Sequence, residues 1–156
     1  NDPSILLRMK EDNDGAEPAA SSIAALNLLR LSQLREDAHW QERAEKTIAA
    51  FSATLTNSPS AMPQMLVALA QSVGKPRQIV IAGEKDALET RALLREVHRH
   101  YLPGRILLRA DDGAGEAVCQ MTPLGGKSAA YVCENFTCQA PVSEPAALRK
   151  LLEVAR

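Results

Sequence analysis

One nearly continuous apolar segment near the amino end constrains the fold of this 156-residue chain more than any other feature. Ser21 or Ser22 can cap a helix that runs to about Gln33. The apolar residues of this helix lie on most of its sides and leave only a narrow polar stripe of three residues. The apolar set is Ile23, Ala24, Ala25, Leu26, Leu28, Leu29, Leu31 and Leu34, and the stripe is Asn27, Arg30 and Gln33. Such a helix needs protein around most of its circumference.

The rest of the first half supplies too little to surround that helix. Apolar residues at three- and four-residue spacing predict a second helix over about 37–55 and a third that follows Ser58-Pro59-Ser60 and stops at Gly74. Three helices do not enclose one of their own number on nearly all sides. We therefore expect missing helical neighbours, from the rest of a longer chain or from a partner subunit. A start at Asn1 without a basic and apolar leader fits a fragment or a processed product.

In the second half of the chain the apolar residues follow a different spacing, with short strand-like runs as well as a helical pattern. A short β-branched run at 78–83, a helix over about 86–101 and an apolar run at 105–110 form a β-α-β unit, so the two strands should be parallel. A third strand is predicted at 129–133, a turn at 134–136, and a last helix after Ser143. The predicted fold class is α+β: a helical segment over 1–76, then a small α/β subdomain over 77–156 with a mostly parallel sheet.

Composition excludes several classes of function. Eighteen Lys and Arg against nineteen Asp and Glu give no field that attracts nucleic acid, and five aromatic residues offer few platforms for stacking bases. The longest apolar run, 65–70, is far shorter than the roughly 20 residues that cross a bilayer, so no membrane span is predicted. Three cysteines do not form the even framework of a small secreted scaffold, which favours a reducing compartment, and we expect the cytoplasm.

Two cysteines, Cys133 and Cys138, form a candidate thiol pair, because a four-residue spacer after a strand can bring two sulfurs together. Three interpretations stay open: inert thiols packed in a turn, a reversible disulfide, and a metal or catalytic pair. Buried small thiols are the commonest of these in proteins. A thioredoxin-type site needs two intervening residues at a helix start, and a zinc site needs two further ligands at a paired spacing, which the sequence does not show.

Three arginines one helical turn apart, Arg91, Arg95 and Arg99, are a candidate patch for phosphate or another anion. The alternative is a solvated helix face, partly neutralised by Glu96. Gly83 follows the first strand in the manner of a dinucleotide loop, but the further glycines that let a backbone approach a pyrophosphate are missing.

A third candidate is Glu17, in the loop before the apolar helix. A carboxylate there could project into a cavity and act as acid, base or sugar ligand, and Asp12 and Asp14 are near enough in sequence to join it. The alternative is a solvated acidic loop that suits the helix dipole. No Ser-His-Asp order, HExxH, P-loop or nucleophile elbow is present. Catalytic residues therefore stay unknown, and neither a metal nor a cofactor is predicted.

Four blocks of sequence carry a family resemblance. They are Ala16-Glu17-Pro18, the run 25–31 (ALNLLRL), the run 78–83 (QIVIAG) and, above all, the run 130–142 (AYVCENFTCQAPV). Over essentially all 156 residues the chain resembles the C-terminal part of the thioredoxin-domain-containing family that includes mammalian spermatogenesis-associated protein 20. One departure is that the family tends to read Glu-Pro-Ser-x-Asn-Ser where this chain has Ser21 in place of the Asn.

The resemblance implies an architecture and a class of activity. Members of that family look like an N-terminal thioredoxin-like domain followed by an α/α toroid similar to N-acylglucosamine 2-epimerases and six-hairpin glycosidases. This chain would hold the last toroid helices and the small α/β tail, with the rest of the chain as its partner. A carbohydrate or related polar small molecule is the expected ligand, Glu17 and Asn27 are the candidate cavity-facing groups, and the fragment alone should be inactive. The alternative is a non-catalytic protein-interaction or redox-adaptor module.

Overall fold

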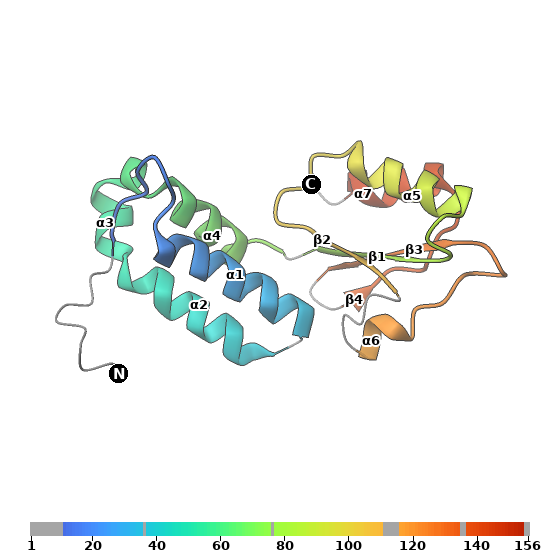
Figure 1. The fold of residues 1–156 in the computed structure, drawn as a ribbon, viewed down its shortest axis with the longest axis horizontal. Coiled ribbons are helices and arrows are strands. Elements are labelled where there is room, and N and C mark those ends of the chain that lie inside the picture. Colours follow the sequence, from blue (N-terminus) through green and yellow to red (C-terminus); the bar gives the residue numbers. More distant parts are fainter. Residues whose placement is uncertain (1–10, 36, 76, 111–115, 135–136, 155–156) are drawn as a thin grey trace. The chain divides into compact units, whose positions relative to one another are not determined.

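The computed structural model describes residues 11–35, 37–75, 77–110, 116–134 and 137–154 (Figure 1). Its contacts divide the chain into two compact units. One comprises Asn1–Ser32 with Glu36–Gly74, and the other comprises Gln33–Arg35 with Lys75–Arg156. We call them the helical unit and the α/β unit. None of the helices in the described residues is both long enough and apolar enough to cross a bilayer.

The helical unit is a small bundle. Its elements are α1 (Ala20–Arg35), α2 (Ala38–Ala50), α3 (Ser52–Asn57), a 3-10 turn η1 (Pro59–Ala61) and α4 (Pro63–Val73). The single helix predicted over 37–55 is thus two helices. The break falls at Phe51, whose backbone (φ −104°, ψ 12°) leaves the helical region while its N–H still bonds to the carbonyl of Ile48. The apolar core is made by Ala25, Leu26, Leu29, Ala44, Ile48, Phe51, Met62, Met65 and Ala68.

Helix α1 differs from the prediction at its start and agrees with it along its length. The helix begins at Ala20, so Ser21 and Ser22 lie inside it and neither is the expected cap. The Ala19 N–H donates instead to Asp14 Oδ1, at 2.7 Å. One side of α1 is buried through Ala25, Leu26 and Leu29, whereas Ile23 and Leu31 are 38% and 37% exposed. The bundle therefore covers one side of α1 and leaves apolar residues of the other side in solvent.

The α/β unit contains a four-stranded sheet with the strand order β2-β1-β3-β4. Its elements are β1 (Arg77–Ala82), α5 (Leu88–His98), β2 (Ile106–Arg109), α6 (Glu116–Cys119), β3 (Ala129–Glu134), β4 (Thr137–Cys138) and α7 (Pro145–Val154). Strands β1 and β2 are parallel, as the β-α-β pattern predicts. Figure 1 shows α5 and α7 side by side over one face of the sheet.

The sheet is mixed, and the expectation of a mostly parallel sheet is wrong. Strand β3 runs antiparallel to β1, with Ala129 opposite Ala82, and β4 runs antiparallel to β3. The physical reason lies in the connection after β2. A further parallel strand needs a crossover that returns the chain to the starting edge, and α6 has only four residues. The chain therefore enters β3 at the edge where β1 and β2 end. The α+β class itself is confirmed.

The core of the α/β unit lies between the sheet and the two helices on it. Alternate residues Ile79 and Ile81 of β1 and Ala130 and Val132 of β3 point to the same face, as the two-residue period of a strand requires. Leu93 and Val97 of α5, with Leu148 and Leu152 of α7, cover them. This packing holds in place the sheet whose strands β3 and β4 carry Cys133 and Cys138.

Candidate functional site

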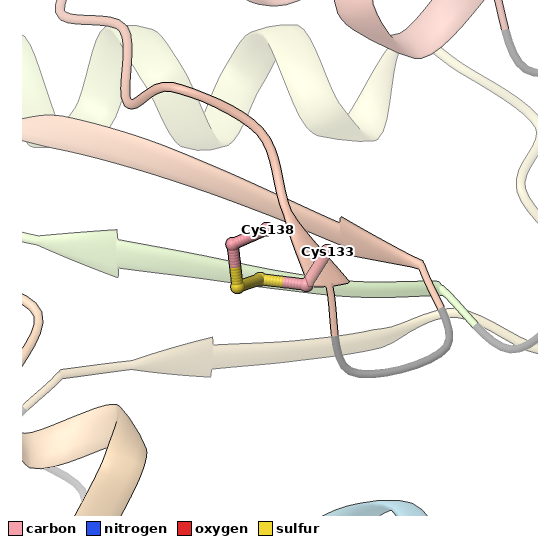
Figure 2. The surroundings of a disulfide bond; sticks show 2 residues. All are labelled: Cys133 and Cys138. Atoms are coloured by element: carbon pink, nitrogen blue, oxygen red, sulfur yellow. A yellow bond between two sulfur atoms is a disulfide. The ribbon is translucent and has the colours of Figure 1, made fainter.

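Cys133 and Cys138 are joined as a disulfide between β3 and β4 (Figure 2). The two residues lie directly opposite each other in the antiparallel register. Because the neighbouring pair is hydrogen-bonded, with Gln139 N–H donating to Val132 O at 3.0 Å, the cysteines occupy a non-hydrogen-bonded position. In that position opposing Cα atoms lie closest, and here they are 3.9 Å apart. The backbone register thus brings the sulfurs together, and of the three interpretations left open the structure contains the disulfide.

The two residues of the disulfide differ in their exposure to solvent. Cys133 on the inner strand β3 is 2% exposed, whereas Cys138 on the edge strand β4 is exposed. Glu134, next to Cys133, is held by Arg77 of β1 through a contact of 2.8 Å, and Arg77 also donates to the Leu152 carbonyl of α7. Strand β3 is therefore anchored independently of the disulfide. Asn135 and Phe136, which complete the predicted turn, lie outside the described residues.

Metal binding finds no support in the described part of the chain. No three His, Cys, Asp or Glu side chains come together there in a way that could hold a metal ion. The third cysteine, Cys119, is exposed and not disulfide-bonded.

The arginines of the predicted patch are distributed among separate partners. Arg91 pairs with Asp86 at 2.8 Å, and its hydrogen bond lowers the pKa of that carboxyl. Arg99 donates to Glu96 at 3.1 Å, and Arg95 is exposed. Two of the three cations are thus already matched by carboxylates on or beside the same helix.

Glu96, predicted from the sequence only to offset the charge of the arginine stripe, is buried. Its side chain is 2% exposed and accepts hydrogen bonds from Arg149 of α7, at 2.7 and 3.2 Å, while His100 lies 3.2 Å away. The Arg149 hydrogen bonds outweigh burial, which acts in the opposite direction, and with His100 and Arg99 they lower the pKa of Glu96 to about 2. The sequence could have indicated this burial, because Glu96 follows Leu93 by three residues and so lies on the inner face of the same helix. Its role is to hold α5 to α7.

Glu17 and Asn27, the candidate cavity-facing groups, are both exposed. Glu17 lies in the turn before α1 and Asn27 on the outer side of α1. Neither side chain lines the cavity at the end of the sheet or the apolar groove on the helical unit.

Asp14, named only as a neighbour of Glu17, has a defined structural role. Besides the Ala19 N–H, it accepts from the N–H groups of Gln64 and Met65 in the first turn of α4, at 2.8 and 3.3 Å. Partial burial raises the pKa of Asp14, but these backbone donors and the Ser22 side chain together outweigh it and lower the pKa below its ordinary value of 3.8. Asp14 therefore joins the starts of two helices and is committed to the fold.

A cavity of about 690 Å³ lies at the carboxyl ends of β1 and β2. Ligands of open α/β sheets commonly bind at such edges. Its wall carries both signs of charge together with hydroxyl groups, from Glu84, Lys85, Glu89, Arg109, Thr122 and Ser128. A small polar molecule fits this chemistry in size and polarity.

Gly83, at the floor of that cavity, is required by close packing. Its φ is +154°, and a Cβ there would come within 2.3 Å of Ser128 Oγ and 2.8 Å of Thr90 Oγ1. Those two hydroxyls share a hydrogen bond of 2.8 Å. The glycine therefore fits over a buried hydroxyl pair, which explains its presence without a dinucleotide.

The second cavity is an apolar groove of about 360 Å³ on the helical unit. Ile48, Ala49, Leu55 and Leu69 supply its apolar wall, and Glu45 and Ser72 lie at its margin. Its lining offers few groups that could orient a polar substrate.

Comparisons with known proteins identify relatives but no domain family. No family model matches the chain, and no solved structure does. Human spermatogenesis-associated protein 20 is 39% identical over 153 residues, which cover 94% of this chain and 20% of the human protein. The rat protein of the same name is 37% identical over 94% of this chain and 19% of its own length. An uncharacterised protein of Caenorhabditis elegans is 34% identical, over 96% of this chain and 21% of that protein.

The chain thus spans about a fifth of the length of the curated relatives it matches. Identity at this level over nearly the whole chain establishes common descent, and the family resemblance drawn from the sequence blocks is confirmed. The chain is homologous to one part of spermatogenesis-associated protein 20.

Proposed function

We propose that the helical unit is one section of a larger helical assembly completed by the rest of a longer chain, and that this longer protein acts on a carbohydrate or a related polar small molecule. The observation that carries the proposal is the outer face of α1. Ile23, Asn27 and Leu31 follow one another at four-residue spacing on that face, and all three are exposed.

That outer face is unusual for a helix at a final protein surface. Single exposed apolar residues are common, but α1 carries apolar residues on both its buried and its exposed sides. Val67 and Val73 of α4 are also exposed, at 51% and 78%. A unit that ends in solvent would be expected to place charged residues at these positions.

The occupant we propose for that face is a helix from the remaining four-fifths of a chain as long as its relatives. The family resemblance implies that this remainder includes a thioredoxin-like domain and the other helices of an α/α toroid. Because Ile23 and Leu31 are 38% and 37% exposed, covering their exposed parts with such a helix would stabilise the assembly by about 0.5–1 kcal/mol for each side chain.

The carbohydrate part of the proposal rests on the likeness of that family to epimerases and glycosidases. Glycoside hydrolysis typically uses two carboxyl groups that face one bound sugar, and the cavity at the end of the sheet and the groove on the helical unit are lined by neither Glu17 nor Asn27. Their partners would come from the other helices. We therefore expect no turnover of any sugar by the 156-residue chain alone.

One experiment tests the assembly. Leu31→Ser should lower the unfolding free energy of the 156-residue chain by only about 1 kcal/mol, because Leu31 is 37% exposed there. In a chain as long as its relatives it should cost about 2–3 kcal/mol, because the leucine is then buried. Leu29→Ser is the matched control and should destabilise both proteins. An equally small effect of Leu31→Ser in the long chain would contradict the assembly.

A second experiment tests the ligand. A panel of sugars is screened by thermal shift on the long chain and on its Glu17→Gln variant, with Glu11→Gln as the exposed acidic control. We expect one sugar class to raise the Tm, and only Glu17→Gln to abolish the increase. No increase with any sugar would contradict the carbohydrate proposal and leave the assembly test unaffected.

A further inference from the structure

We propose that the Cys133–Cys138 disulfide is a thiol–disulfide exchange site, at which a dithiol reductant attacks Cys138 and, by reducing the bond, frees β4 from β3. This inference goes beyond the carbohydrate proposal and does not depend on it. It gives the redox-adaptor alternative a specific location in the fold.

The register of the sheet makes the disulfide reversible without rearrangement of the core. The cysteines face each other at a non-hydrogen-bonded position, and their Cα atoms are 3.9 Å apart. Two thiols released at this position stay within reach of each other, because they are only five positions apart in the sequence. The pair can therefore close again when an oxidised disulfide is supplied.

Unequal access selects the sulfur that is attacked. A nucleophilic thiolate has to approach one sulfur directly, and only Cys138 presents its sulfur from an exposed residue, while Cys133 is 2% exposed. Cys138 lies on β4, the edge strand next to β3, and Figure 2 shows the bond between the two cysteines. We therefore assign Cys138 as the attacked residue and Cys133 as the leaving group.

The step balances with a dithiol as the reductant. One thiolate of the dithiol forms a bond to Cys138 Sγ, the Cys133–Cys138 bond breaks, and Cys133 leaves as a thiolate that takes a proton from water. The second thiol of the reductant then attacks the mixed disulfide and releases Cys138. Two electrons pass to the protein, which gains two thiols, and the reductant leaves as a disulfide.

Reduction removes the covalent tie of a weakly paired edge. Strand β4 has two residues. Between Cys138 and Val142 the segment advances four residues while β3 advances three, from Cys133 back to Ala130, so one residue bulges out of the pairing. Pro141 within this bulge has no N–H to donate. By contrast, β3 keeps its six-residue pairing with β1 and the Arg77–Glu134 contact. We therefore expect reduction to loosen 137–142 and to leave the core intact.

The first test is a redox titration of the full 156-residue chain carrying Cys119→Ser, which leaves only the proposed pair. The protein is equilibrated in glutathione buffers of graded ratio, and its thiols are counted by mass after alkylation. We expect one two-electron transition within the buffered range, with faster hydrogen exchange in 137–142 on reduction and unchanged exchange in β1. A bond that stays closed in the most reducing buffer, or thiols that stay free in the most oxidising one, would overturn the proposal.

The second test locates the attack. The same oxidised protein is treated briefly with glutathione, alkylated, and mapped by peptide mass. We expect the glutathione adduct on Cys138 at roughly tenfold or more the level found on Cys133. Equal labelling, or labelling mainly at Cys133, would overturn the assignment. Because this protein retains both cysteines, neither test depends on the folding of a Cys133 variant.

Discussion

Each unit of this protein contains a carboxylate that connects two of its helices, and the two carboxylates work in different ways. Asp14 in the helical unit accepts backbone N–H groups at the starts of α1 and α4. Glu96 in the α/β unit accepts side-chain donors, from Arg149, Arg99 and His100. Both carboxyl groups have lowered pKa values, so the pKa alone does not distinguish their roles.

The difference lies in what remains when each carboxylate is removed. The backbone donors of α4 cannot turn away, and an unsatisfied helix start loses a hydrogen bond that nothing replaces. Arg149 and Arg99 have side chains that are 49% and 68% exposed, so they can turn to water instead. We therefore expect the less buried Asp14 to matter more for stability than the fully buried Glu96.

The largest effect is expected for Asp14→Ala. This change removes the acceptor of three backbone N–H groups and should lower the free energy of unfolding of the helical unit by about 2 kcal/mol, at the upper end for a helix cap. Urea unfolding followed by the fluorescence of Trp40, the single tryptophan, measures it. The exposed Asp12→Ala is the control, with an expected change within about 0.5 kcal/mol. An equal loss in both variants would break the comparison.

Acid should weaken the helical unit through the same residue. Because the folded pKa of Asp14 is below 3.8, its stabilisation is fully present above that pH and is lost as the pH falls through the lower, folded value. Asp14→Asn keeps a neutral acceptor and should remove this part of the pH dependence. An unchanged acid profile in the Asn variant would show that another group controls it.

An intermediate effect is expected for Glu96→Gln. The pKa of Glu96 falls from 4.5 to about 2 on folding, so its contribution is present above pH 4.5 and is lost between pH 4.5 and about 2. The variant should be less stable than the parent at neutral pH and should lose less stability over that acid window. Hydrogen exchange of α5 and α7 peptides measures both. Glu89→Gln, an exposed change on the same helix, should leave the acid profile unaltered.

The smallest effect is expected for Glu42→Gln. Glu42 also has a lowered pKa, caused mainly by its hydrogen bond to Lys46, but the two side chains are 58% and 74% exposed. Exposed pairs of this kind contribute little because water and salt screen them. We expect an unchanged urea midpoint at low and at high salt. A clear shift at low salt would show that a lowered pKa is itself informative about stability in this protein.

Local signals predicted the elements but missed the partners that lie far away in the sequence. The apolar helix and the parallel pair of β1 and β2 follow from periods that a short window contains. The start of α1 cannot be predicted in this way, because the N–H of Ala19, just before it, is capped by Asp14. Asp14 also binds the start of α4, 50 residues further along the chain. The break at Phe51 is equally invisible, since the apolar spacing continues through it.

The direction of β3 and the candidate site show the same limit. The sequence of 129–133 does not indicate at which edge of the sheet the chain enters β3. That edge depends on the preceding connection, in which α6 has only four residues. The spacing of Cys133 and Cys138 indicated that they could meet, but only the register placed them opposite each other. Glu96 was hidden because its main partner, Arg149, is 53 residues away.

The bulge around Pro141 has a consequence for how this protein behaves at high concentration. An exposed strand edge invites pairing with the edge of another molecule, and long regular edges are the usual start of aggregation. A strand from another molecule would find only two residues of β4 to pair with. Beyond them lie the bulged residue and Pro141, which has no N–H to donate. This end of the sheet is therefore protected against intermolecular growth by its own irregularity.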